Sequence, residues 1–195
     1  MHQNKRHKGL LSFIGAAVSS LLLASVLMSS GESEVIECTA QGTSSQLGKT
    51  FTLKITIDEY SPEEDRQALI QAFEKDKNPG LHRALGKLKT RGRMQTPGTV
   101  GYELKFIRLM PTSAAGTRRI RILTDRPIAI GESMKQTRSM DYSLSFIELE
   151  LNEDKAKSTG ILLPLCELHV DKKTMELNVE VRRNPFNLVN FFYQK

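Results

Sequence analysis

Residues 51–58 read FTLKITID and carry the clearest secondary-structure pattern in the chain. Apolar side chains alternate with polar ones along all eight positions. A period of two is the pattern of a β-strand with one buried face and one face in water. We therefore expect a strand here whose apolar side faces a hydrophobic core.

Two short helices are expected directly after this strand. Ser61, Pro62 and Glu64 form a typical helix start, with Ser61 as the cap and Glu64 completing a capping box. An apolar stripe follows at residues 69–73. Asn78-Pro79-Gly80 interrupts that helix, and apolar residues at helical spacing then begin again.

The remainder of the chain predicts β-structure almost throughout. Ile120 and Ile122 alternate with arginines, as expected for one half of a hairpin whose other half is residues 102–106. The alternation changes phase within residues 142–151, so we expect a β-bulge near Phe146. Further strands are expected at residues 35–39, 161–170, 175–181 and 188–193.

Short polar turns separate these strands, which favours antiparallel pairing because parallel neighbours need crossovers of a dozen residues or more. The sheet must hide its apolar face by curling or by packing against the helices. The sequence thus predicts an α+β, mainly β fold. We expect an antiparallel meander that forms a curved sheet or small barrel, with two short helices inserted after the first long strand.

The first 31 residues predict export. Residues 1–8 are polar and basic, residues 9–28 carry no charge, and small residues follow, which is typical of a signal peptide. A helix of that apolar run would span roughly 30 Å, so an uncleaved anchor in the inner membrane is the alternative. Either reading places the domain in the periplasm or outside the cell.

These patterns divide the chain into three parts. We expect a signal peptide or anchor at residues 1–31, a short strand and Gly/Ser-rich linker at 32–50, and a single β-rich globular domain at 51–195. The formal net charge is +6, but three basic residues belong to the leader, and beyond it 25 basic residues face 22 acidic ones. So small an excess argues against nucleic acid as a partner.

Two cysteines, Cys38 and Cys166, lie beyond the leader. In an oxidising compartment they could form a disulfide if the fold brings their Cα atoms within about 7 Å. The alternative is two separate small core residues.

Familiar catalytic motifs are missing from the sequence. It contains no nucleophile elbow and no glycine-rich nucleotide loop. Beyond the leader only His82 and His169 could act as imidazole ligands, and neither has a second ligand at a useful spacing. We expect no catalytic residues, no cofactor and no metal.

One polar cluster is a candidate ligand or partner site. Asp125 and Arg126 end a predicted strand, whereas Arg138, Asp141 and Tyr142 open the next one. Strand ends at the rim of a barrel often hold ligands. The structural alternative is that the aspartates cap turns and pair with the arginines to fix the loop between the strands.

Three stretches resemble a family of uncharacterised exported bacterial proteins: TPGxxGYEL at residues 96–104, TDRPI at 124–128, and RSMDY at 138–142 with IEL at 147–149. The resemblance covers the chain from about Thr52 to its end. Cys38 and Cys166 are not part of the pattern. The family has no assigned activity, cofactor or catalytic residue, so the resemblance implies export and a shared fold but no mechanism.

Taken together, these features predict a non-catalytic envelope protein that binds a small apolar ligand or an envelope protein, and touches the membrane only through its N-terminal segment if this is uncleaved. One alternative is a hydrolase using Asp125 and Asp141 as paired carboxylates, and another is a membrane-tethered structural protein. A cavity of roughly 300 Å³ or more, lined by Leu, Phe and Tyr with Asp125 or Arg138 at its mouth, would favour the ligand binder, whereas a filled interior with an exposed apolar patch would favour an interaction module.

Overall fold

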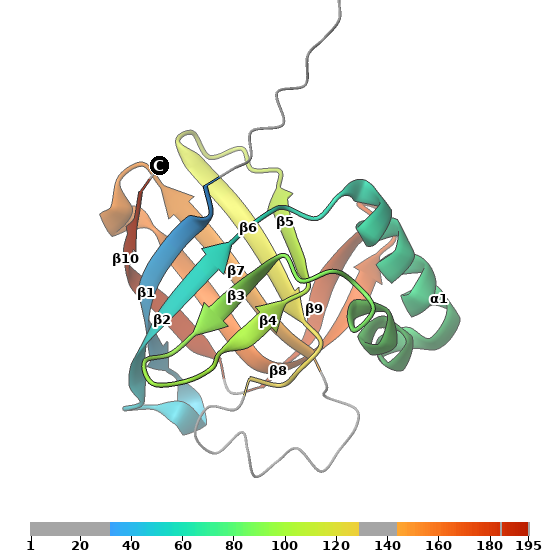
Figure 1. Ribbon diagram of the computed structural model, residues 1–195, viewed down its shortest axis with the longest axis horizontal. Helices are drawn as coiled ribbons and strands as arrows, with labels where there is room; N and C mark the ends of the chain where they lie inside the picture. Colours follow the sequence, from blue (N-terminus) through green and yellow to red (C-terminus); the bar gives the residue numbers. More distant parts are fainter. Residues whose placement is uncertain (1–31, 129–143, 184, 195) are drawn as a thin grey trace, which may run out of the picture. The chain divides into compact units, whose positions relative to one another are not determined.

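A computed structural model describes residues 32–128, 144–183 and 185–194, and for residues 181–183 it describes the backbone only. The described part is a ten-stranded antiparallel sheet that nearly closes into a barrel, with one interrupted helix beside it (Figure 1). The mainly β, α+β fold is thereby confirmed. The elements are β1 (Glu34–Gly42), η1 (Ser44–Gln46), β2 (Thr50–Ile57), α1 (Glu63–Leu85), β3 (Gly92–Gln95), β4 (Tyr102–Leu104), β5 (Phe106–Met110), β6 (Thr117–Thr124), β7 (Leu144–Asn152), η3 (Lys155–Lys157), β8 (Thr159–Asp171), β9 (Glu176–Arg183) and β10 (Phe186–Tyr193).

The barrel remains open between its two edge strands, β4 and β5. The strand order is β4-β3-β2-β1-β10-β8-β7-β6-β5, and only Lys105 separates β4 from β5 along the chain. Ser61 bridges the seam, because its N–H donates to the carbonyl of Ile107 at 2.7 Å and its Oγ accepts from the Ile107 N–H at 3.0 Å. The expectation that Ser61 caps the helix is therefore wrong. The helix begins at Glu63 without a side-chain cap.

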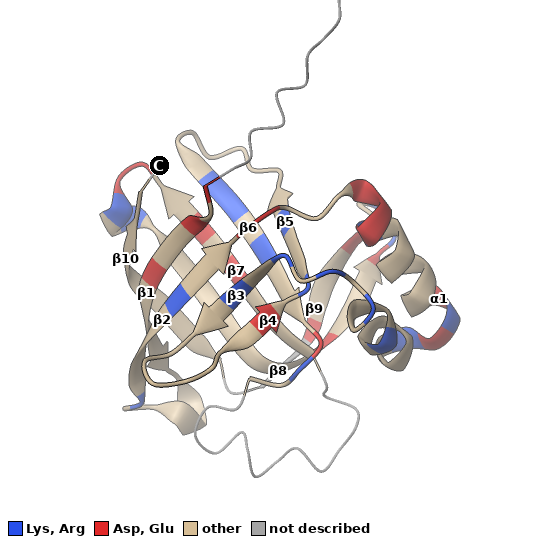
Figure 2. Ribbon diagram, viewed as in Figure 1, with Lys and Arg blue, Asp and Glu red and all other residues tan. Residues whose placement is uncertain are grey.

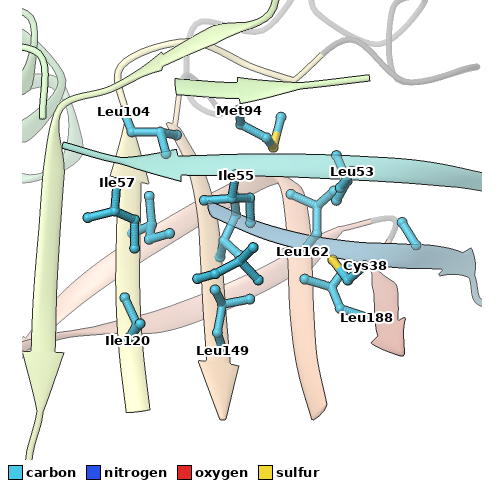
Figure 3. Close-up of a cluster of buried hydrophobic side chains, with 14 of the residues drawn as sticks. Cys38, Leu53, Ile55, Ile57, Met94, Leu104, Ile120, Leu149, Leu162 and Leu188 are labelled. Atoms are coloured by element: carbon cyan, nitrogen blue, oxygen red, sulfur yellow. The ribbon is translucent and has the colours of Figure 1, made fainter. Parts of the chain in front are cut away.

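Apolar side chains fill the inside of the barrel (Figure 3). Leu53, Ile55 and Ile57 of β2 all point inward, as the alternation at residues 51–58 predicts. The buried interior cluster comprises Ile36, Cys38, Ala40, Leu53, Ile55, Ile57, Met94, Leu104, Ile107, Ile120, Ile122, Ile128, Ile147, Leu149, Leu151, Leu162, Phe186, Leu188, Phe191 and Tyr193.

A second apolar cluster lies outside the barrel wall, beneath α1. Phe146 of β7 belongs to this outer cluster, whereas Ile147 belongs to the interior one. The phase change in residues 142–151 therefore arises because both faces of this strand are buried. The register irregularity near Phe146 places the extra residue on β8, where Leu163 and Cys166 pair with Phe146 and Leu144.

The helix consists of two helical stretches, as the sequence predicts. Asp76 and Lys77 have non-helical backbone angles, so the break falls just before Asn78. The Asn78 side chain docks this break on β8, since its Nδ2 donates to the Leu168 carbonyl at 3.1 Å and its Oδ1 accepts from the Leu168 N–H at 2.9 Å. Among the described residues, no helix combines the length and apolar character that crossing a bilayer requires.

Strand β8 belongs to the barrel in its first half and to a side hairpin in its second. Residues 159–163 and Cys166 pair with β7 and residues 160–162 also pair with β10, whereas residues from Leu165 onward pair with β9. Segment 32–50, expected as a short strand and linker, contributes the nine-residue β1, which pairs with β2 on one side and β10 on the other.

Candidate binding site

The two sequence-predicted site residues that the structure describes, Asp125 and Arg126, lie just after β6. The Asp125 carboxylate is half-buried beside Gly86, the residue that follows α1. The Arg126 side chain is exposed, and its carbonyl lies 2.8 Å from the hydroxyl of buried Ser145. That hydroxyl also accepts from the Ile128 N–H at 2.9 Å. These contacts fix the course of the chain after β6.

The other three residues of the predicted cluster, Arg138, Asp141 and Tyr142, lie outside the described residues. The proposed pairing of Asp125 with Asp141 therefore stays a hypothesis. No group of three or more His, Cys, Asp or Glu side chains within the described ranges is placed to hold a metal ion.

Both cysteines are free thiols. Cys38 lies in the interior cluster, and Cys166 lies in the outer cluster on the other side of the wall. The structure thus does not support the disulfide that the sequence allowed. Burial raises the pKa of each thiol to about 12, with the charge of Glu167 adding to the effect at Cys166.

The arginines of β6 are paired with carboxylates and do not form a free basic surface. Arg118 pairs with Glu34 at 2.5 Å, and Arg119 pairs with Glu150 at 2.6 Å. Arg121 pairs with Glu148 at 2.6 Å and is itself only 8% exposed. A strand whose cations are matched in this way offers little attraction to a polyanion.

A recess of about 650 Å³ lies at the end of the barrel where β1 and β6 begin and β10 ends. We call it the β1–β10 recess. Its lining mixes charged, polar and apolar side chains, unlike the apolar interior of the barrel. It is lined by Glu32, Ser33, Glu34, Val35, Glu37, Arg118, Phe192 and Gln194.

Phe192 is the aromatic residue of this recess, and a β-bulge directs it outward. Phe186 and Leu188 point into the barrel, but after Asn190 the inward positions become Phe191 and Tyr193. The register between β1 and β10 slips at this point, and Asn190 has φ = 55°. Asparagine adopts such a left-handed conformation more readily than most residues. As a result the side chain of Phe192 is 59% exposed.

A regular strand at residues 188–193, as the sequence predicts, would place Phe192 on the same buried face as Leu188, but the structure turns Phe192 outward. A bulge depends on how β10 meets β1, so the local pattern of residues 186–193 does not reveal it. The asparagine at position 190 is the one sequence signal that could have indicated it. Lys155 places its Nζ 5.0 Å from the centre of the Phe192 ring and so helps to hold the ring in place.

The charged residues of the recess fall into two groups. Arg118 engages Glu34 through both guanidinium nitrogens, and Glu34 also accepts from the Tyr60 hydroxyl at 3.1 Å. Burial, followed by the charge of Glu34, raises the pKa of Tyr60 to about 12. Glu32 and Glu37, by contrast, have no ion-pair partner among the described residues, although Lys54 lies opposite Glu37 in the β1–β2 register.

The arrangement is suited to binding a positively charged, partly apolar group. Two carboxylates without ion pairs attract a positive charge, and the adjoining Phe192 and Val35 side chains offer apolar contact. Figure 2 shows acidic residues on β1 at this end of the barrel.

Compared with known proteins, the chain matches no family model, no curated protein and no solved structure. The resemblance to exported bacterial proteins therefore stays a prediction.

Proposed function

We propose that this protein is a non-catalytic, exported interaction protein whose β1–β10 recess binds a positively charged, partly apolar segment of an envelope protein. The observation that carries the proposal is the outward-facing Phe192 beside Glu32 and Glu37. Aromatic anchors with neighbouring charges are common features of energetically important contacts.

The filled interior favours this reading over a small apolar ligand held inside the barrel. Twenty buried residues occupy the interior cluster of the described chain. A small apolar ligand inside the barrel would need an empty cavity lined by these buried side chains. The recess lies at the barrel end, and its mixed lining is better matched to a peptide segment than to a lipid-like molecule.

Peptide binding to purified protein tests the recess directly. The probe is a short fluorescent peptide of alternating lysine and leucine, with a glutamate–leucine peptide as its comparison, and fluorescence anisotropy measures binding. We expect only the basic peptide to bind, and we expect its binding to weaken as salt rises. Phe192→Ala should weaken it more than tenfold, and Glu37→Gln should weaken it by a smaller factor.

Two matched variants control for general effects. Leu109→Ala removes another exposed apolar side chain, and Glu64→Gln removes another exposed carboxylate. Both should bind the basic peptide like the unaltered protein. Equal binding by the Phe192→Ala variant, with its circular dichroism spectrum retained, would contradict the proposal.

Native mass spectrometry of protein purified from its own envelope distinguishes the two kinds of partner. A co-purifying protein subunit supports the interaction module. A co-purifying lipid or metabolite instead restores the ligand-binding alternative.

The export proposal rests on the leader at residues 1–31 and is tested separately. N-terminal sequencing of the mature protein should find a start near Glu32 if the leader is a signal peptide. Retention of Met1 in a membrane fraction would support the tethered structural alternative. Residence in the cytosol would overturn export altogether.

A further inference from the structure

The end of the barrel opposite the recess carries two loops that lie at the same edge. Residues 43–49 connect β1 to β2, and residues 96–101 connect β3 to β4. The strand registers bring the loops to one end, because Gln41 pairs with Thr50 and Lys54 pairs with Gln95. Both loops extend toward the lower left in Figure 1. The nine-residue β1 spans about 26 Å between this end and the recess.

Each loop exposes one aliphatic side chain. Leu47 is 82% exposed and Val100 is 83% exposed, the highest values among the exposed large apolar residues in the described chain. We call these two residues the aliphatic tips. Single exposed aliphatic residues are common, so exposure by itself does not identify a function.

Both tips are held on ordered turns. The Leu47 N–H donates to the Ser44 carbonyl at 3.1 Å, above the almost fully buried Gln46. In the second loop the Thr99 N–H and hydroxyl both donate to the Thr96 carbonyl, at 3.1 and 2.9 Å. The tips are therefore presented at fixed positions, and their insertion elsewhere would need little further ordering of the chain.

A basic side chain is bound to each loop. Lys49 Nζ donates to Gln46 Oε1 at 2.7 Å, and Arg93 Nη1 donates to the Val100 carbonyl at 3.2 Å. Residues 38–57 and 90–102 contain no acidic residue. Glu103, opposite Arg93 in the β3–β4 register, is engaged by Lys105 at 2.7 Å. This end of the barrel is thus basic around its aliphatic tips, whereas the recess at the other end is lined by three glutamates.

We propose that the aliphatic tips insert Leu47 and Val100 into the interface of a lipid bilayer that carries anionic headgroups, with Lys49 and Arg93 contacting those headgroups. A bilayer accepts isolated aliphatic side chains without shape complementarity, and basic residues near its surface add electrostatic attraction. A protein partner would instead favour aromatic anchors in one packed patch. This surface is distinct from the recess, and docking through it would leave the recess facing away from the bilayer.

Tryptophan fluorescence locates each tip relative to the bilayer. The chain contains no tryptophan, so a single introduced one reports only its own position. The variants are full-length chains with Leu47→Trp, Val100→Trp or Leu109→Trp, the last being a 52% exposed leucine on the barrel wall. They are mixed with vesicles of phosphatidylglycerol and brominated phosphatidylcholine. We expect a blue shift and quenching for the first two variants and neither change for Leu109→Trp.

Charge variants test the role of the headgroups. Lys49→Gln combined with Arg93→Gln should lower partitioning onto phosphatidylglycerol vesicles by about fivefold for each charge lost. The control, Lys172→Gln with Lys173→Gln, removes the same charge from the exposed β8–β9 turn and should partition like the unaltered chain. All variants carry the same leader, so any affinity that it has for vesicles is common to them.

The outcomes are decisive in both directions. Bound protein with unquenched tryptophan at positions 47 and 100, or with equal quenching at position 109, overturns the proposal. If both double variants lose partitioning equally, the proposed contact of Lys49 and Arg93 with the headgroups is wrong. The proposal is supported if Lys49→Gln with Arg93→Gln loses vesicle binding, Lys172→Gln with Lys173→Gln retains it, and only the tryptophans at positions 47 and 100 are quenched.

Discussion

At the scale of single residues, burial controls the chemistry of the two thiols. Cys38 and Cys166 are 2% and 0% exposed, and the pKa of each is raised to about 12 because the thiolate would lose its hydration. A thiol with such a pKa is protonated at neutral pH and is a poor nucleophile.

We therefore predict that a thiol reagent at pH 8 labels neither cysteine in the folded protein and labels both in denaturant without reductant. Burial blocks the reagent in the first case, and free thiols become accessible in the second. Mass spectrometry counts the labels. An unfolded, unreduced chain that takes up no label would mean that the cysteines are bonded after all.

At the scale of elements, one buried arginine connects the side hairpin to the barrel. The Arg121 Nη1 donates to the Leu177 carbonyl at 2.6 Å and to Asn178 Oδ1 at 2.9 Å, while its other nitrogens bind Glu148. Strand β6 is thereby joined to both β7 and β9. The guanidinium also lies over the Phe146 ring, 5.4 Å from its centre.

Arg121→Ala should lower the free energy of unfolding by about 3 kcal/mol, because it leaves the Glu148 charge and the Leu177 carbonyl without their partner in a largely buried site. Arg119 is the matched control. It is two residues away on β6 and pairs with Glu150, but both side chains are over one-third exposed. Its loss should lower stability by less than about 1 kcal/mol. Urea unfolding measures both values, and equal losses would contradict the assigned role of Arg121.

At the scale of the whole molecule, Glu63 joins the helix to the barrel. Arg66 and Arg108 both donate to its carboxylate, and Arg108 also pairs with Glu176 of β9 at 3.1 Å. The hydrogen bond from Arg66, followed by that from Arg108, lowers the pKa of Glu63 from 4.5 to about 2. The folded protein therefore binds fewer protons here than the unfolded chain does.

This difference predicts an acid-dependent stability. The contribution of Glu63 is fully present above pH 4.5 and is lost as the pH falls through about 2. The melting temperature should thus decrease between these values, and it should decrease less steeply in Glu63→Gln. Glu64→Gln, which removes the adjacent exposed carboxylate, is the control. Calorimetry across this range measures the slopes, and identical slopes for Glu63→Gln and the unaltered protein would refute the assignment.

Features that depend on a residue and its near neighbours could be predicted from the amino-acid sequence. Alternation at residues 51–58 specified β2 and its inward face, and the Asn78-Pro79-Gly80 triplet indicated the interruption of the helix within two residues of its place. Antiparallel pairing followed from the short turns. The polar cluster at Asp125 and Arg126 was also visible, and its role as a site stays a prediction.

The amino-acid sequence did not reveal which strands are buried on both faces or which residues line the recess, because these depend on tertiary packing. Phe146 changes the phase of β7 because it packs in the outer cluster, which also contains residues of α1, while Phe192 turns outward because β10 has one more residue than β1 at the bulge. Ser61 bonds to Ile107 across the seam in place of capping its own helix. The physical reason is common to these cases. The free energy of each side chain depends on partners many positions away along the chain, and a periodic pattern carries no record of those partners.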